Sequence, residues 1–172
     1  MTWKSHIAFA TAVTFPFNPS AIPLAVIGST APDWSETILK FFGIQVEHRG
    51  MTHYLSNPLA IIFISLFLDY HSFVFWFGIG YLTHWFCDAL TITGVPLFPY
   101  THHRVHFFGG VLRTGHIQEY ILTFGLLFLS YSVFSNTHTK DGFNPYYIEF
   151  SKLYQDNVID EKEYRDNKFK IF

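Results

Sequence analysis

Charged residues are nearly absent from the first 135 residues of the chain. That segment holds eleven of the 24 Lys, Arg, Asp and Glu residues, whereas the last 37 residues hold thirteen. Two long apolar runs, 73–90 and 120–134, approach the ~20 residues that a helix needs to cross a bilayer. The pattern predicts an all-α integral membrane helical bundle, with an embedded domain over 1–135 and a polar C-terminal tail, expected as a surface helix, over 136–172.

Shorter apolar stretches are interrupted by turn-forming residues. The stretches 6–15 and 21–28 flank PFNPS, and 58–68 is separated from 73–90 by DYHS. Neither arm of the first pair spans ~30 Å at 1.5 Å per residue, so we expect a re-entrant or short N-terminal hairpin followed by about three membrane helices. Each hairpin returns the chain to the membrane face that it left.

The run 73–90 carries polar side chains on one helical face: Thr83, His84, Cys87, Asp88 and Thr91. Gly78 and Gly80 are expected to allow close approach of another helix. A buried aspartate in the membrane costs about 2.5–3.5 kcal/mol on insertion scales, so it is expected to face a partner. His84 and Asp88, at i and i+4, can share one ion. The same pair also fits a His–Asp hydrogen bond between helices or a proton relay.

Further metal-competent residues occur where the apolar stretches begin and end: His6, Asp33, His48, His53 and Glu119. Each has a structural alternative, such as a histidine bonded to a carbonyl or, for Asp33, a helix cap after Pro32. The hairpin topology gathers them with His84 and Asp88 at one membrane face. We therefore predict a divalent metal site, with one or two zinc-like ions or manganese and a metal-activated water.

The cations near this face are candidates for substrate binding. Arg49 and Arg104 are expected to hold a phosphate-like group, with snorkelling to the interface as the alternative. The histidines of THHRVHF and His116 are expected at the headgroup level, outside the metal site. The distribution of Lys and Arg favours a cytoplasmic site.

Other features exclude some classes of protein. A net charge of −2 argues against nucleic-acid binding through a basic surface. The single cysteine, Cys87, excludes an internal disulfide. The N-terminal segment lacks a clean cleavage site, so we expect it to be retained. The expected partners are membrane lipid and a second copy of the chain.

The blocks that contain these residues are SHIAFA, GSTAPDWSE, HRGMTHYL, GYLTHWFCDALTITGVPLFP and RTGHIQE. In this order they resemble, over about residues 5–120, the YdjM-type family of membrane-bound metal-dependent hydrolases, described as LexA-regulated proteins of the bacterial inner membrane. More distantly, the ligand order resembles zinc-dependent phospholipase C. That resemblance implies one ion on Asp33, His53, His84 and Asp88, and another on Asp88 and His6. The family's PDxDH pattern is replaced here by PDWSE, so whether Glu36 substitutes for a ligand stays open.

We therefore expect a hydrolase that acts on a phosphoester such as a lipid headgroup. The expected metal ligands are His6, Asp33, His48, His53, His84 and Asp88, the catalytic residues Asp33, Arg49 and Glu119, and the substrate-binding residues Arg49 and Arg104. Two other classes stay open: a proton or ion relay through His84 and Asp88, and a non-catalytic scaffold stabilised by metal.

Overall fold

The structure, a computed structural model, describes residues 1–68, 71–99, 103–141 and 150–167. Within these ranges the chain forms seven α-helices: α1 (Trp3–Thr14), α2 (Ile22–Phe41), α3 (Ser56–Ser65), α4 (His71–Ala89), α5 (Ile117–Asp141), α6 (Phe150–Gln155) and α7 (Glu161–Asn167). The remaining elements are three 3-10 turns, Pro19–Ala21, Met51–His53 and Phe107–Gly109, and a short antiparallel pair, β1 (Val95–Pro96) and β2 (Arg104–Val105). The all-α prediction is confirmed.

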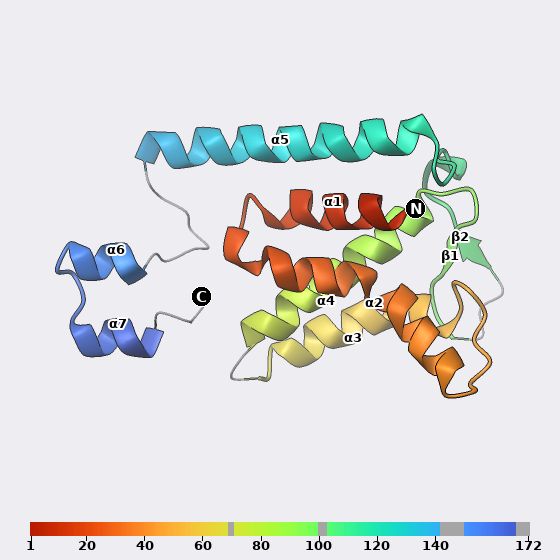
Figure 1. The fold of residues 1–172 in the computed structure, drawn as a ribbon, viewed down its shortest axis with the longest axis horizontal. Helices are drawn as coiled ribbons and strands as arrows, with labels where there is room; N and C mark the ends of the chain where they lie inside the picture. The colour runs from red at the N-terminus through yellow and green to blue at the C-terminus, as the bar shows by residue number, and fades with distance from the viewer. Residues whose placement is uncertain (69–70, 100–102, 142–149, 168–172) are drawn as a thin grey trace.

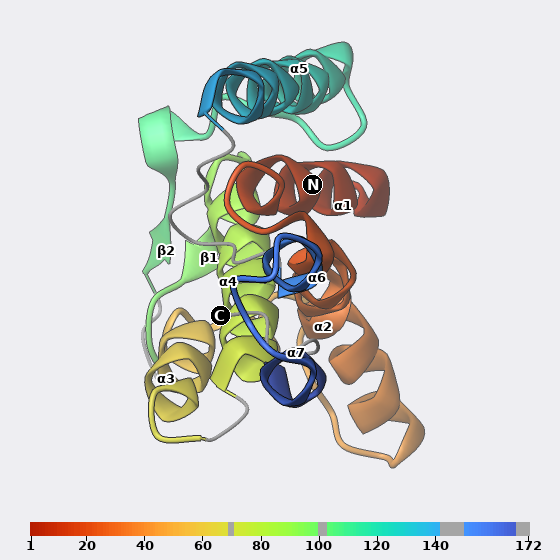
Figure 2. The same cartoon turned by 90° about the vertical axis from the view of Figure 1, so that its left-hand side faces the viewer.

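Helix α4 occupies the centre of the bundle. It packs against α1, α2 and α3, while α5 runs beside α1 along the opposite edge (Figures 1 and 2). The expected hairpins therefore form, α1 with α2 and α3 with α4, and the start of α1 lies near the ends of α2 and α4 that carry the candidate ligands.

Glycines allow α2 and α4 to meet backbone to backbone. A Cβ atom on Gly80 would lie 1.9 Å from the carbonyl oxygen of Ala25, and a Cβ atom on Gly28 would lie 2.1 Å from that of Phe77. No side chain larger than hydrogen fits at either position. This contact confirms the role expected of Gly80, and in the same region of α2 the Ser29 carbonyl and the Asp33 carboxylate lie near the His84 imidazole.

Helix α2 is longer than the sequence analysis predicts. The expected arm ends at residue 28, but α2 continues through Pro32 to Phe41. Asp33 is therefore an interior helical residue, and the alternative of Asp33 as a helix cap is wrong. A proline inside a helix costs about 3 kcal/mol because it removes a hydrogen bond. Pro32 is itself buried, and the packing of α2 against α4 offsets that cost.

One helix in the described part of the chain is long and apolar enough to cross a membrane. It is the segment Ile117–Ser135 of α5, of which 17% is buried inside the protein. Helix α3 has ten residues, or about 15 Å, and is too short to span. Of the three or so membrane helices expected, one in the described part of the chain satisfies both criteria, so the number of membrane helices stays a prediction.

The described residues of the polar tail contain the end of α5 and two short helices, α6 and α7, where one surface helix was expected. Asn157, with φ of 55°, lies between α6 and α7 and ends the first of them. A positive φ is incompatible with a continuous right-handed helix. The domain boundary at residue 135 stays a prediction.

Candidate metal centre

Five predicted ligands from four segments converge at one end of α4. His6 comes from α1, Asp33 from α2, His53 from the turn Met51–His53, and His84 and Asp88 from α4. They form two groups whose ligand atoms lie within 4.8 Å of one another: His6, His84 and Asp88, and Asp33, His53 and His84. His84 belongs to both groups. The described residues therefore contain side chains that could hold a metal ion.

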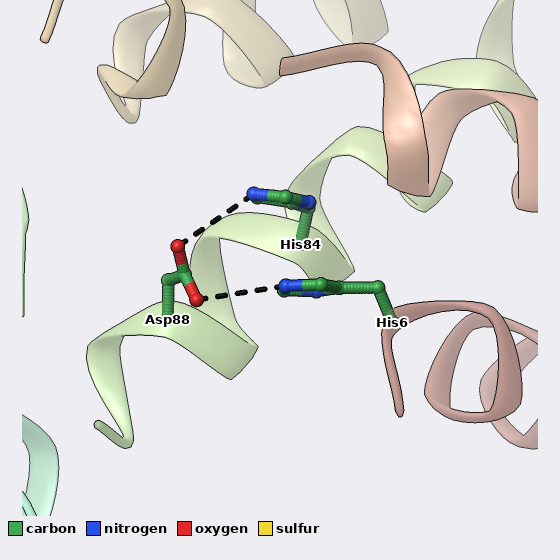
Figure 3. A group of neighbouring side chains, drawn as sticks. All are labelled: His6, His84 and Asp88. Carbon is green, nitrogen blue, oxygen red and sulfur yellow. Dashed lines mark ion pairs between the residues drawn. The ribbon is translucent and has the colours of Figure 1, made fainter. Parts of the chain in front are cut away.

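The first group combines two parallel imidazoles with one carboxylate (Figure 3). The rings of His6 and His84 stack with centroids 3.8 Å apart. Their Nε2 atoms point to different oxygens of Asp88, at 3.5 Å for His6 and 3.7 Å for His84. These separations exceed those of normal hydrogen bonds. They are close to the ~3.4 Å between two ligand atoms that share a tetrahedral zinc ion at ~2.1 Å.

The second group places Asp33 between two histidines. Its Oδ1 lies 3.5 Å from Nε2 of His53 and 3.9 Å from Nε2 of His84. Burial raises the pKa of the Asp33 carboxyl, but the nearby His53 and His84 imidazoles outweigh it and hold the pKa below its usual value. Asp33 is therefore an anion at neutral pH, as a metal ligand must be.

Three imidazole nitrogens are buried without a hydrogen-bond partner among the described residues: Nδ1 of His6, Nε2 of His53 and Nε2 of His84. Nδ1 of His84 lies 2.6 Å from the carbonyl oxygen of Ser29 and donates to it, so Nε2 carries the lone pair. A ligating histidine is commonly oriented through its other nitrogen in this way. Because buried polar atoms are normally paired, this donor set fits a divalent cation.

Arg49 is the direct partner of Asp88. Its guanidinium donates to Oδ1 of Asp88 at 2.9 Å and to Oγ1 of Thr91 at 2.9 Å. The amino group of Met1 forms an ion pair with the same carboxylate oxygen. Arg49 is buried and has φ of 59°, an unfavourable backbone conformation for arginine that these contacts stabilise.

His48 and Glu36 pair with each other beside the two groups. Nδ1 of His48 lies 3.0 Å from Oε2 of Glu36, and Lys40 donates to Oε1 at 2.5 Å. Burial raises the pKa of Glu36, but its bonds to Lys40 and His48 outweigh that effect and lower the pKa below the usual value. The predicted ligand His48 therefore lies outside both groups, although its ring is near that of His53.

A cavity of about 350 Å³ leads to the centre. Its lining residues come from α1, α2, α4 and the loop that follows α2: Met1, Trp3, His6, Asp33, Glu36, Thr37, His48, Arg49 and Asp88. The carboxylates of Asp33 and Asp88 and the His6 imidazole thus line the cavity. A small polar ligand could reach them.

Two predicted site residues lie elsewhere. Glu119 is buried, but its carboxylate accepts hydrogen bonds from the backbone of Thr2 at 2.7 Å and of Gly115 at 2.8 Å, which ties the start of α1 to α5. Arg104 is exposed on β2 and does not line the cavity. Neither contacts the His and Asp groups.

Two further residues of the polar face predicted over 83–91, Cys87 and Thr91, lie in different environments. Cys87 packs in an apolar cluster with Phe9, Leu90 and Leu112, away from the two groups. Thr91, in contrast, binds Arg49 and supports the site. Sequence reasoning missed Ser29, and no sequence signal identifies it because it acts through its backbone carbonyl. Exposed His103 and His116 lie outside both groups, as expected, and His102 lies outside the described residues.

The chain is therefore an all-α protein with a helix of membrane-spanning length and a buried group of His and Asp residues that could hold a metal ion. Residues 1–143 match the family described as YdjM inner membrane protein, so the chain belongs to that family. The matched region contains every residue of the candidate centre. No curated protein and no solved structure matches the chain.

Proposed function

We propose that this protein is a metal-dependent hydrolase of the bacterial inner membrane that acts on a phosphoester at headgroup depth. The observation that carries the proposal is the pair of buried, unpartnered Nε2 atoms of His53 and His84 beside the carboxylates of Asp33 and Asp88. Removing such atoms from water without a partner costs about 1–3 kcal/mol each. A bound cation would offset that cost.

The proposed ion is zinc-like, and His84 is the ligand common to both possible coordination groups. Because Nε2 of His84 has one lone pair, it can bind only one ion, which His53, Asp33, His6 or Asp88 would also coordinate. A second ion would need a bridging carboxylate such as Asp88. His48 would join only after its bond to Glu36 is broken.

The ion would act as a Lewis acid and lower the pKa of a coordinated water, which is the chemistry of hydrolytic zinc sites. The other tasks fall to the chain itself. Arg49 pairs with Asp88 and presents a guanidinium to the cavity, where it can bind a phosphate oxygen. The site face is proposed to be cytoplasmic. Helices α3, α4 and α5, together with the short N-terminal hairpin of α1 and α2, are proposed to form the membrane-embedded part.

Phosphoester turnover by the purified full chain tests this proposal. We expect hydrolysis of a lipid phosphoester that a chelator abolishes and added zinc restores. Asp33→Asn removes one charged ligand and should lower the rate by more than the 10–100-fold typical of outer-sphere changes. His116→Ala alters an exposed histidine outside both groups and serves as the matched control. Turnover that survives both the chelator and Asp33→Asn would refute the proposal.

Two alternatives predict other results. A proton or ion relay through His84 and Asp88 predicts uptake into liposomes and no ester turnover. A metal-stabilised scaffold predicts that chelation lowers the melting temperature of a protein that never hydrolyses esters. The replacement of the family's second acid by Ser35 is the feature that favours the scaffold.

A further inference from the structure

The cavity beside the candidate centre opens to the surface between α1, α2 and the loop after α2. Three of its lining residues are also exposed: Trp3 at 55%, Thr37, and His48, whose side chain is 66% exposed. The opening is therefore bounded by the first turn of α1 and the last two turns of α2.

Exposed apolar side chains continue from this opening along both helices. On α1, Ile7 lies one turn beyond Trp3 and is 38% exposed. On α2, Trp34 and Phe41 lie one turn on either side of Thr37 and are 38% and 85% exposed. We call Trp3, Ile7, Trp34 and Phe41 the apolar rim. Residues one helical turn apart share a face, so the apolar rim borders the same opening from two sides.

The size and charge of the surroundings indicate what would occupy the rim. A cavity of about 350 Å³ is at the small end of the ~300–1,000 Å³ range of ligand sites, and its floor is polar, so it suits a headgroup and excludes long acyl chains. Two cations stand beside the rim, exposed Lys4 next to Trp3 and half-exposed Lys40 next to Phe41. In an inner membrane protein, the apolar molecule that meets such a surface is a lipid.

We propose that the apolar rim binds the acyl chain of an anionic phospholipid whose phosphate enters the cavity. The inference rests on the proposed function and names its substrate class: a membrane lipid that arrives sideways from the bilayer, in contrast to a water-soluble phosphoester. Lys4 attracts the anionic headgroup, whereas the charge of Lys40 is already paired with Glu36. The rim distinguishes long-chain substrates from short ones.

Tryptophan quenching tests the proposal without any turnover. The probe is a phosphonate analogue of phosphatidic acid, whose C–P bond resists hydrolysis, with bromine atoms on its acyl chains. It is titrated into the zinc-loaded full chain in detergent micelles, and brominated diacylglycerol is the control for non-specific partitioning. We expect saturable quenching by the phosphonate at concentrations at least about tenfold below those needed with diacylglycerol. Trp34→Phe should reduce the quenching amplitude.

A pair of matched variants locates the contact. Ile7→Ser with Phe41→Ser changes the rim and should raise the dissociation constant about tenfold or more, because apolar contact is lost. Ile121→Ser with Phe124→Ser changes equally apolar side chains on α5, 66% and 64% exposed, and should leave the affinity unchanged. Unchanged affinity in the rim variant, or an equal loss in the α5 variant, would overturn the proposal.

Two further outcomes also count against it. Equal affinity for a water-soluble phosphonate without acyl chains would show that the cavity alone selects the ligand. A rim variant that changes the oligomeric state but not the affinity would assign this face to a second copy of the chain. Metal content is measured on the same samples. A protein without metal refutes the proposed function. A metal-loaded protein whose rim variant binds the phosphonate with unchanged affinity refutes this inference alone.

Discussion

Replacing Gly80 by alanine tests whether the contact between α2 and α4 assembles the candidate metal centre. The added Cβ atom would lie 1.9 Å from the carbonyl oxygen of Ala25, so the two helices must separate by more than about 1 Å to restore van der Waals contact. Overpacking of this kind costs about 1–3 kcal/mol, and the higher helix propensity of alanine returns about 1 kcal/mol. Since the neighbour is backbone and cannot rotate away, we expect a net loss of about 2 kcal/mol.

The same separation should weaken metal binding. It moves the Ser29 carbonyl away from Nδ1 of His84 and the Asp33 carboxylate away from Nε2 of His84. Metal sites tolerate deviations of only about 0.2 Å in ligand distance, and loss of an orienting hydrogen bond alone lowers affinity about 10–100-fold. We therefore expect a zinc affinity at least about tenfold weaker in Gly80→Ala.

Denaturant unfolding in detergent and competition with a chromophoric zinc chelator measure the two effects. Gly125→Ala is the matched control, because its Cβ atom meets nothing within 4 Å and the substitution lies in α5. The control should be neutral or slightly more stable and bind zinc normally. If Gly80→Ala matches the control in both stability and affinity, the close packing of α2 on α4 does not position the centre.

Three further predictions concern the charged groups. Arg49→Gln leaves the buried Asp88 carboxylate poorly compensated and should destabilise the metal-free protein by about 3 kcal/mol, with part of the loss recovered in unfolding experiments with saturating zinc. Glu36→Gln should cost at most about 1 kcal/mol at pH 7, because the side chains of Lys40 and His48 are 50% and 66% exposed. Since the pKa of Glu36 is lowered on folding, this contribution is complete above about pH 4.5 and is lost as the pH falls further, so wild type and variant should converge in acid unfolding. Chelation should lower the melting temperature of the wild type at neutral pH, and calorimetry with and without zinc measures the shift.

The sequence predicts the elements and the main candidate ligands because these depend on local patterns. The i,i+4 spacing of His84 and Asp88 puts them on one face of α4, and the proline and asparagine of PFNPS mark the turn between α1 and α2. Hairpin topology then brings His6 to His84, which local spacing alone could not show.

What the sequence does not predict depends on tertiary contacts. Pro32 indicates a helix end, yet packing on α4 carries α2 past it and places Asp33 inside a helix. His48 and Glu119 have the chemistry of site residues, but the fold pairs His48 with Glu36 and Glu119 with backbone N–H groups. Ser29 contributes a carbonyl that every residue type possesses.

The metal content of the purified full chain tests whether the two His/Asp groups hold a metal ion. Elemental analysis should find about one tightly bound divalent ion per chain in the wild type and in the His116→Ala control, and almost none in His84→Ala, because His84 belongs to both ligand groups. A wild-type protein without metal, or a His84→Ala variant that keeps the ion, would contradict the account.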